Sequence, residues 1–204
     1  MNSKRIIGVV IADNSDCIGY KNKIPIKIPQ CIDNVKRMAK TSWVIVGKNS
    51  LEQVSKMYNF NPQKYLIISS EEIKGKKTFK TIEDAIKWAN ENDPSPKNDI
   101  YVIGGQRVLQ YCHDNDIFDE FFKIRIDVDI GGDTYLGFKT NDWVCVKTTE
   151  VYYQVGYQFW YEKYDARKKN NKPTDDKAVE RSIEESYMQE IGLEIGTRYN
   201  PSDD

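Results

Sequence analysis

The sequence predicts an α/β domain: a central, mostly parallel sheet of about eight strands with helices on both faces and an antiparallel C-terminal edge. Three observations predict it. Short strand-like runs alternate with helix-like segments, an order typical of parallel sheets. Most of these runs are continuously apolar, as in strands that are covered on both faces. The last two runs are rich in β-branched and aromatic residues and are expected to form an antiparallel hairpin.

The expected elements follow one another along the chain without a long gap. The strands are expected at 5–12, 43–46, 65–69, 77–79, 99–103, 120–129, 143–150 and 158–164. The helices are expected at 30–38, 50–57, 81–90 and 106–112. Thr81 with Asp84 three residues later resembles a helix N-cap. The pair Gly104-Gly105 opens the last helix.

Length and composition favour one domain over 1–164 and an extension over 165–204. The chain has 204 residues, of which 39% are hydrophobic. This suits a core for about 160 residues. The 30 basic and 31 acidic side chains give a net charge of −1. That balance predicts no nucleic-acid partner and no membrane partner.

No apolar run approaches the roughly 20 residues that cross a bilayer. The apolar run 6–12 has no cleavage pattern of small residues after it, so it predicts a buried strand and not a signal peptide. The expected location is the cytoplasm. The lysine- and asparagine-rich composition suggests a low-GC genome, and in a viral protein the location would be the host cytoplasm.

Cysteine and histidine spacing disfavours a metal site. Cys17, Cys31, Cys112 and Cys145 are far apart and form no C-x-x-C pair, and His113 adjoins only one of them. Neither a zinc site nor a disulfide framework is expected from this pattern. A histidine-dependent hydrolase is equally disfavoured.

Two strand–glycine–helix junctions have the form of phosphate cradles. A helix N-terminus offers unpaired N–H groups and a positive dipole end to an anion, and glycine permits close backbone approach. The first junction comprises Gly47, Lys48, Asn49 and Ser50, and the second comprises Gly104, Gly105, Gln106, Arg107 and Val108.

A motif near the N-terminus resembles a known family. Residues 18–31 read I-G-Y-K-N-K-I-P-I-K-I-P-Q-C. The frame I-G-x-x-N-x-x-P-x-x-x-P resembles the mobile loop and first helix of dihydrofolate reductases. The two cradles and the turn Gly132-Asp133-Thr134 follow in the family's order, so the resemblance covers about 5–164. It implies an NADPH-dependent oxidoreductase that converts 7,8-dihydrofolate to tetrahydrofolate, and an aspartate at 133 that hydrogen-bonds the mobile loop.

The resemblance also implies a cofactor site for NADPH. Lys48 stands where the family usually has an arginine, and a lysine lacks the bidentate fork. Lys80 matches a position that often faces the 2′-phosphate. The residues implied for the cofactor are Ile11, Ile18, Gly19, Gly47, Lys48, Asn49, Ser50, Ser69, Ser70, Glu71, Lys80, Gly104, Gly105, Gln106, Arg107, Val108 and Thr134.

The substrate side departs from the family. Cys31 stands where the resemblance implies an Asp or Glu, the one ionisable group of the pterin pocket. A thiol is a weak donor, and burial raises its pKa, so it would neither hold the pterin nor polarise a water. Ile124 replaces a threonine that partners the acid, and Gln63 replaces an arginine that clamps the folate carboxylate. Asp33 is the alternative acid, but two helical positions rotate it by about 200° away from Cys31.

Three functions stay open on this evidence. The first is a weak or altered dihydrofolate reductase. The second is a catalytically inactive scaffold with a structural or protein-binding role. The third is a reductase of a less polar substrate. The implied small-molecule pocket comprises Val10, Ile11, Ile24, Ile26, Cys31, Ile32, Val35, Gln63, Ile103 and Ile124.

The extension has a different character from the domain. Charged residues to Lys172 and then Pro173 suggest a linker, and Thr174 is a candidate helix cap. An apolar residue then recurs every four positions as one narrow stripe, which predicts an amphipathic helix over 174–192. It is expected either to pack on the domain itself or to dock a protein partner or a second copy. A free tail is expected at 199–204.

Overall fold

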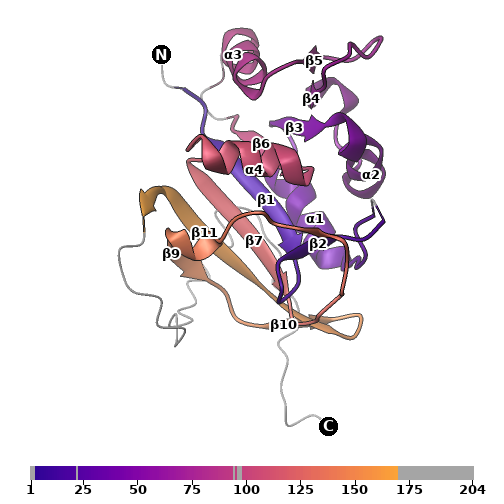
Figure 1. The fold of residues 1–204 in the computed structure, drawn as a ribbon, viewed down its shortest axis with the longest axis vertical. Helices are drawn as coiled ribbons and strands as arrows, with labels where there is room; N and C mark the ends of the chain where they lie inside the picture. The colour runs from indigo at the N-terminus through magenta and orange to yellow at the C-terminus, as the bar shows by residue number, and fades with distance from the viewer. Residues whose placement is uncertain (1–2, 22, 94, 96–97, 170–204) are drawn as a thin grey trace.

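The computed structural model describes residues 3–21, 23–93, 95 and 98–169. The helix expected over 174–192 and the tail after it lie outside the described residues. The described chain forms one large mixed sheet flanked by helices (Figure 1). The expected α/β class is confirmed.

The sheet has a parallel half and an antiparallel edge. Its nine strands run in the order β10-β11-β7-β1-β6-β3-β4-β5, with β9 also paired to β11. The mutually parallel strands are β1 (Ile6–Ala12), β3 (Trp43–Gly47), β4 (Tyr65–Ile68), β5 (Thr78–Phe79), β6 (Ile100–Gly104) and β7 (Glu120–Ile126). The antiparallel strands are β9 (Trp143–Thr148), β10 (Tyr152–Gln154) and β11 (Tyr157–Lys169).

Helices cover both faces of this sheet, as expected. α1 (Pro29–Met38) and α2 (Lys48–Tyr58) pack on one face, where Val35 and Val54 join the strand side chains in one buried cluster. α3 (Ile82–Asn92) and α4 (Gln106–Asp114) pack on the other face through a second cluster. Proline at the start of α1 has no N–H to leave unpaired. The Thr81 hydroxyl accepts a hydrogen bond from Asp84 N at 3.1 Å, which is the predicted cap. None of the described helices is long and apolar enough to cross a membrane.

Three features differ from the expected elements. β10 is an additional short strand that forms the hairpin with β11, whereas the hairpin was expected between 143–150 and 158–164; β9 nevertheless also pairs antiparallel with β11. β11 does not end at 164 but continues to Lys169, because a bulge after Asp165 lets Ala166 stay buried and Lys169 pair with Trp143. β2 (Cys17–Gly19) and β8 (Thr134–Tyr135) form a separate two-stranded sheet. Strands of two or three residues are too short to show an alternating pattern in the sequence.

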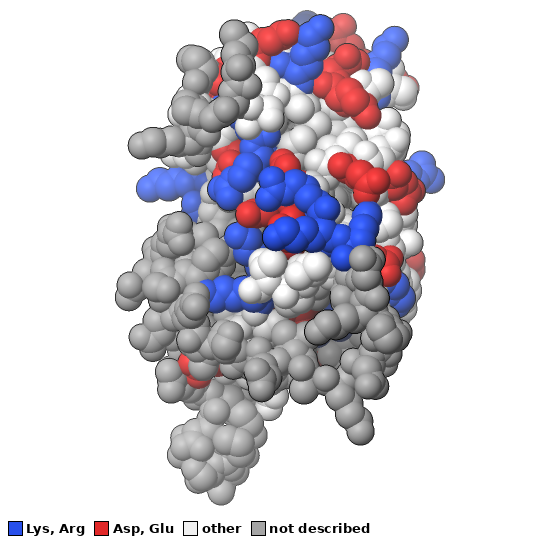
Figure 2. All heavy atoms as spheres, turned by 90° about the vertical axis from the view of Figure 1, so that its left-hand side faces the viewer, with Lys and Arg blue, Asp and Glu red and all other residues white. Residues whose placement is uncertain are grey.

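Charges of both signs share the surface. Figure 2 shows Lys and Arg side chains gathered in the middle of one face, with Asp and Glu side chains among them. Ion pairs link several strand ends: Arg5 lies 2.7 Å from Asp99 and 3.3 Å from Glu120, and Lys163 lies 3.1 Å from Glu120.

Candidate cofactor and substrate site

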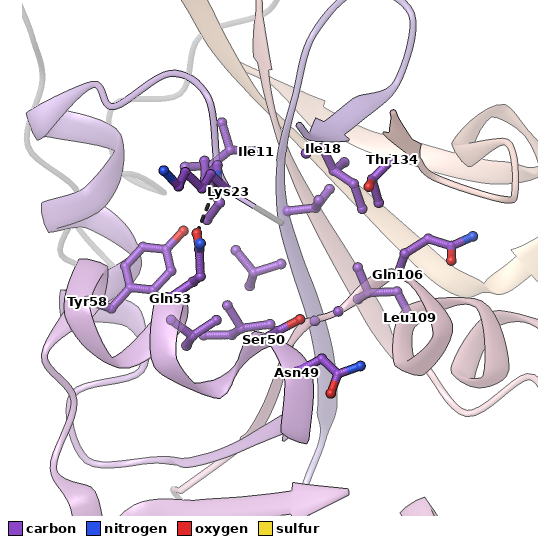
Figure 3. A pocket seen from close by; sticks show the side chains of 18 residues that line it. Ile11, Ile18, Lys23, Asn49, Ser50, Gln53, Tyr58, Gln106, Leu109 and Thr134 are labelled. Atoms are coloured by element: carbon purple, nitrogen blue, oxygen red, sulfur yellow. Dashed lines mark hydrogen bonds between the residues drawn. The ribbon is translucent and has the colours of Figure 1, made fainter. Parts of the chain in front are cut away.

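The site lies at the carboxyl ends of β1, β3 and β6, where open α/β sheets bind ligands. A cavity of about 130 Å³ opens there between α2, α4 and β2 (Figure 3). It is lined by Val9, Val10, Ile11, Ile18, Gly19, Lys23, Ile24, Asn49, Ser50, Gln53, Val54, Tyr58, Ile103, Gly104, Gly105, Gln106, Leu109 and Thr134. A wider groove of about 880 Å³ shares several of these residues and passes over the start of both helices.

Two helix N-termini meet in the groove. The N-cap residues are Gly47 for α2 and Gly105 for α4, and neither helix start has a side-chain cap. Their first N–H groups are therefore available to an anion. A Cβ on Gly105 would lie 2.4 Å from the Ser50 Oγ, so glycine is what allows this close approach. The Gly104–Gly105 peptide bond is cis.

Basic side chains surround the two helix starts. Lys48, Lys80 and Arg107 all line the groove. The Lys48 Nζ donates a hydrogen bond to Glu71 Oε2 at 2.5 Å, and this contact lowers the pKa of the Glu71 carboxyl. Helix dipoles, serine hydroxyls and three cations suit a ligand with several phosphate charges, such as a dinucleotide.

The residues implied for the cofactor come together in space. All of them line the cavity or the groove except Glu71, which reaches the groove through Lys48. The cavity end holds Ile11, Ile18, Gly19 and Gly104, and the groove end holds Gly47, Lys48, Ser69, Ser70, Lys80, Arg107 and Val108; Asn49, Ser50, Gly105, Gln106 and Thr134 lie at both ends. The set fits an extended ligand with an apolar head and an anionic tail.

The loop over the cavity is anchored at both ends. Asp133 Oδ2 accepts a hydrogen bond from Lys21 N at 2.8 Å, and Asp133 N donates to Gly19 O at 3.1 Å. At the other end, the fully buried Asp13 carboxylate accepts from the backbone N–H groups of Ser15 and Cys17, each at 2.8 Å. The contact between the loop and Asp133 had been expected, whereas the anchor at Asp13 had not.

Three residues of the expected pterin pocket lie in the core. Cys31, Val35 and Ile124 are 0%, 0% and 1% exposed, and they line neither the cavity nor the groove. The Tyr161 hydroxyl shares a hydrogen bond with the Cys31 thiol and accepts another from Asn34 Nδ2. Burial is the main cause that raises the pKa of Cys31 to about 12, so the thiol is neutral at physiological pH.

The other expected pocket residues are dispersed. Val10, Ile11, Ile24 and Ile103 line the cavity, and Ile26 lines a small hollow beside it. Ile32 packs against the edge of the core.

Two polar residues considered for the substrate side lie at the surface. Gln63 is exposed, and its Oε1 and backbone oxygen both accept from Lys77 Nζ. Asp33 lies on the solvent side of α1, 3.3 Å from Lys36 Nζ. Neither side chain lines the cavity.

Tyr58 is a site residue that the sequence analysis missed. The expected helix ended one residue before it, whereas α2 includes it and places it on the same buried face as Val54. Its ring stacks on Phe60 with the ring centres 5.3 Å apart. Figure 3 shows its hydroxyl pointing toward Gln53 and Lys23, and Gln53 Oε1 accepts a hydrogen bond from Ile24 N at 3.3 Å.

Comparisons with known proteins agree with this architecture. The family model "Dihydrofolate reductase" matches residues 5–166. A "Dihydrofolate reductase" from Buchnera aphidicola is 32% identical over 122 residues, covering 58% of this chain and 70% of that protein. A "Bifunctional dihydrofolate reductase-thymidylate synthase" from Paramecium tetraurelia is 26% identical over 122 residues, and the match covers 58% of this chain but only 25% of that longer protein. This chain belongs to the dihydrofolate reductase family.

Proposed function

We propose that this protein is an NADPH-dependent reductase of the dihydrofolate reductase type whose turnover of dihydrofolate is weak. One contrast carries the proposal. The groove has open helix starts and basic side chains for a phosphorylated cofactor, while the position of the pterin-binding acid holds the buried thiol of Cys31.

In this proposal the groove would bind the phosphates of NADPH and the cavity would bind its nicotinamide ring. Lys48, Lys80 and Arg107 would bind phosphate oxygens together with the N–H groups at the start of α2 and α4. Bound NADPH supplies a hydride from its nicotinamide ring. Ile18 and Ile103 line the cavity and would exclude water from that ring, and the loop tied to Asp133 would close over it.

Proton delivery is the weak step of the proposed reaction. Reduction of a pterin imine also needs a proton at nitrogen, and no Asp or Glu lines the cavity among the described residues. Cys31 has a pKa of about 12, and Asp33 faces solvent. General acid catalysis is typically worth about 10²–10⁴-fold in rate. We expect the rate of dihydrofolate reduction to be lower by about that factor than in a member with the acid.

A second candidate function is a scaffold without turnover. It is favoured by the packing of Cys31, Val35 and Ile124, three residues of the expected pterin pocket, with Tyr58 and Tyr161 in one buried cluster. Such a protein would act in the cytoplasm through a surface, and segment 174–192 is the candidate for binding a partner or a second copy.

NADPH binding and NADPH oxidation separate the two functions. Binding is measured by quenching of tryptophan fluorescence, and oxidation by absorbance with and without dihydrofolate. Turnover that requires dihydrofolate and is abolished by an antifolate supports the reductase. NADPH binding with no turnover at high enzyme concentration supports the scaffold, and deletion of 170–204 then tests its association. Absence of NADPH binding contradicts the first proposal.

A further inference from the structure

The acidic side chain of Glu71 forms an ion pair with Lys48, one of the three cations that line the groove. Lys48 and Glu71 form an ion pair of 2.5 Å, with side chains 47% and 74% exposed. The Ser69 hydroxyl accepts a hydrogen bond from Glu71 N at 3.1 Å, which holds the turn after β4 beside the groove. Since Lys48 and Ser69 both line the groove, the carboxylate lies where an incoming phosphate would meet Lys48.

The two common nicotinamide dinucleotides differ in what they would present here. NADPH carries a dianionic phosphate on its adenosine ribose, and NADH carries a neutral 2′-hydroxyl. A phosphate must displace the Glu71 carboxylate from Lys48 or remain close to a like charge, and either is unfavourable. A hydroxyl can donate a hydrogen bond to the carboxylate, which is how acidic residues select NADH in other dinucleotide-binding folds.

We propose that Glu71 is a specificity-determining residue that competes with the 2′-phosphate for Lys48 and so weakens the preference for NADPH over NADH. This inference rests on the proposed dinucleotide site. Lys80 and Arg107 also line the groove and make no ion pair with any residue that the structure describes. They remain available to phosphate oxygens, so Glu71 lowers the discrimination between the dinucleotides without abolishing NADPH binding.

The test compares dissociation constants for NADPH and NADH by fluorescence, without turnover. Glu71→Gln keeps the size of the side chain and removes its charge. We expect it to tighten NADPH binding about fivefold at low ionic strength, and to change NADH binding by less than about twofold. The gain should shrink above physiological salt, where the Debye length falls below about 8 Å.

Glu72→Gln is the matched control. Glu72 is the next residue, is exposed and makes no ion pair with the described residues, so its replacement removes the same charge from the same turn. We expect it to leave the ratio of the two dissociation constants within about twofold of the wild type. In a Lys48→Gln background, Glu71→Gln should improve NADPH binding much less. The Lys48 ammonium is then absent, so removing the Glu71 carboxylate no longer frees a cation for the phosphate.

The outcomes separate this inference from the proposal on which it rests. If the wild type binds neither dinucleotide, the cofactor site itself is wrong and the inference falls with it. If the wild type binds them and Glu71→Gln leaves the ratio unchanged, only the role of Glu71 is overturned. An equal gain in Glu72→Gln would also overturn it, since the effect would then be that of net charge.

Discussion

The proposed cofactor half (the groove with Lys48, Lys80 and Arg107) and the proposed substrate half (the cluster around Cys31 and Ile124) are built differently. The groove over α2 and α4 is open, basic and rich in backbone donors. On the substrate side, Cys31 and Ile124 are buried beside Tyr161. A phosphate cradle made of strand–helix junctions is part of the fold itself, whereas pterin recognition depends on a few side chains. A scaffold can therefore keep the first while losing the second.

The largest expected effect comes from restoring a carboxylate to the substrate half. Cys31→Asp places an acid at a position that is 0% exposed. We expect the free energy of unfolding to fall by about 3 kcal/mol, because burial of an ionised or unpaired carboxyl group is costly. We expect little gain in dihydrofolate turnover, since Ile124 and Gln63 remain. Urea denaturation and NADPH oxidation measure the two results.

Cys31→Ser is the control for this change, because it keeps the size of the side chain and adds no charge. Cys31→Ser should lower the free energy of unfolding by about 1 kcal/mol, because the buried hydroxyl is slightly more polar than the thiol. A Cys31→Asp variant as stable as the wild type, with a large gain in turnover, would show that the substrate half is an open pocket.

The next effect tests whether the cofactor half depends on the approach of its two helices. Gly105→Ala would place a Cβ 2.4 Å from Ser50 Oγ, so one of the two must move. We expect the dissociation constant of NADPH to rise about tenfold, because either the Ser50 hydroxyl turns away from the groove or the two helix starts separate. Fluorescence titration measures this change.

The double variant Gly105→Ala with Ser50→Ala is the matched control. It removes the clashing oxygen, and the next contact of the new Cβ is 3.6 Å, an ordinary distance. Affinity should recover in part, with the lost hydroxyl explaining the remainder. Wild-type affinity in Gly105→Ala alone would show that the close approach is not needed, and the contrast between the two halves would weaken.

The sequence predicted the parts of the molecule that depend on local pattern. The apolar strands and the glycines that end β3 and β6 are visible as short patterns of neighbouring residues in the sequence. The structure has them at the expected places. The family resemblance predicts that Cys31 stands in place of the acid, which stays a prediction.

What the sequence did not reveal depends on contacts between distant residues. Tyr161 meets Asn34 across 127 positions, and nothing local marks either residue as a partner. Lys123 is 1% exposed and pairs with Asp16, 107 positions away. The local pattern of β7 shows a lysine in a strand, but only the packing of the loop against the sheet explains its burial. The burial of Cys31, Val35 and Ile124 in one cluster is a long-range property of the same kind.

The smallest expected effect tests how completely Cys31 is buried. Burial raises the pKa of the Cys31 thiol from an ordinary 9.0 to about 12. Folding raises this pKa, so between pH 9 and pH 12 the folded protein keeps the thiol proton that the unfolded chain has released. The contribution of the protonated thiol to stability is therefore complete below pH 9 and is lost as the pH rises toward 12. From pH 8 to pH 10 this one thiol should lower the free energy of unfolding by about 1 kcal/mol. Cys31→Ala should show a smaller loss over the same interval, measured by urea denaturation at both pH values.

Cys112 is the control for the Cys31 measurement. It is buried on the other face of the sheet, and burial also raises its pKa to about 12. If Cys31→Ala and Cys112→Ala reduce the alkaline loss equally, the substrate half is as closed as the core under α4. If only Cys112→Ala does so, the Cys31 thiol ionises in the folded protein as readily as in the unfolded chain. Water would then reach it, as water reaches an open binding pocket, and the substrate half would resemble the cofactor half after all.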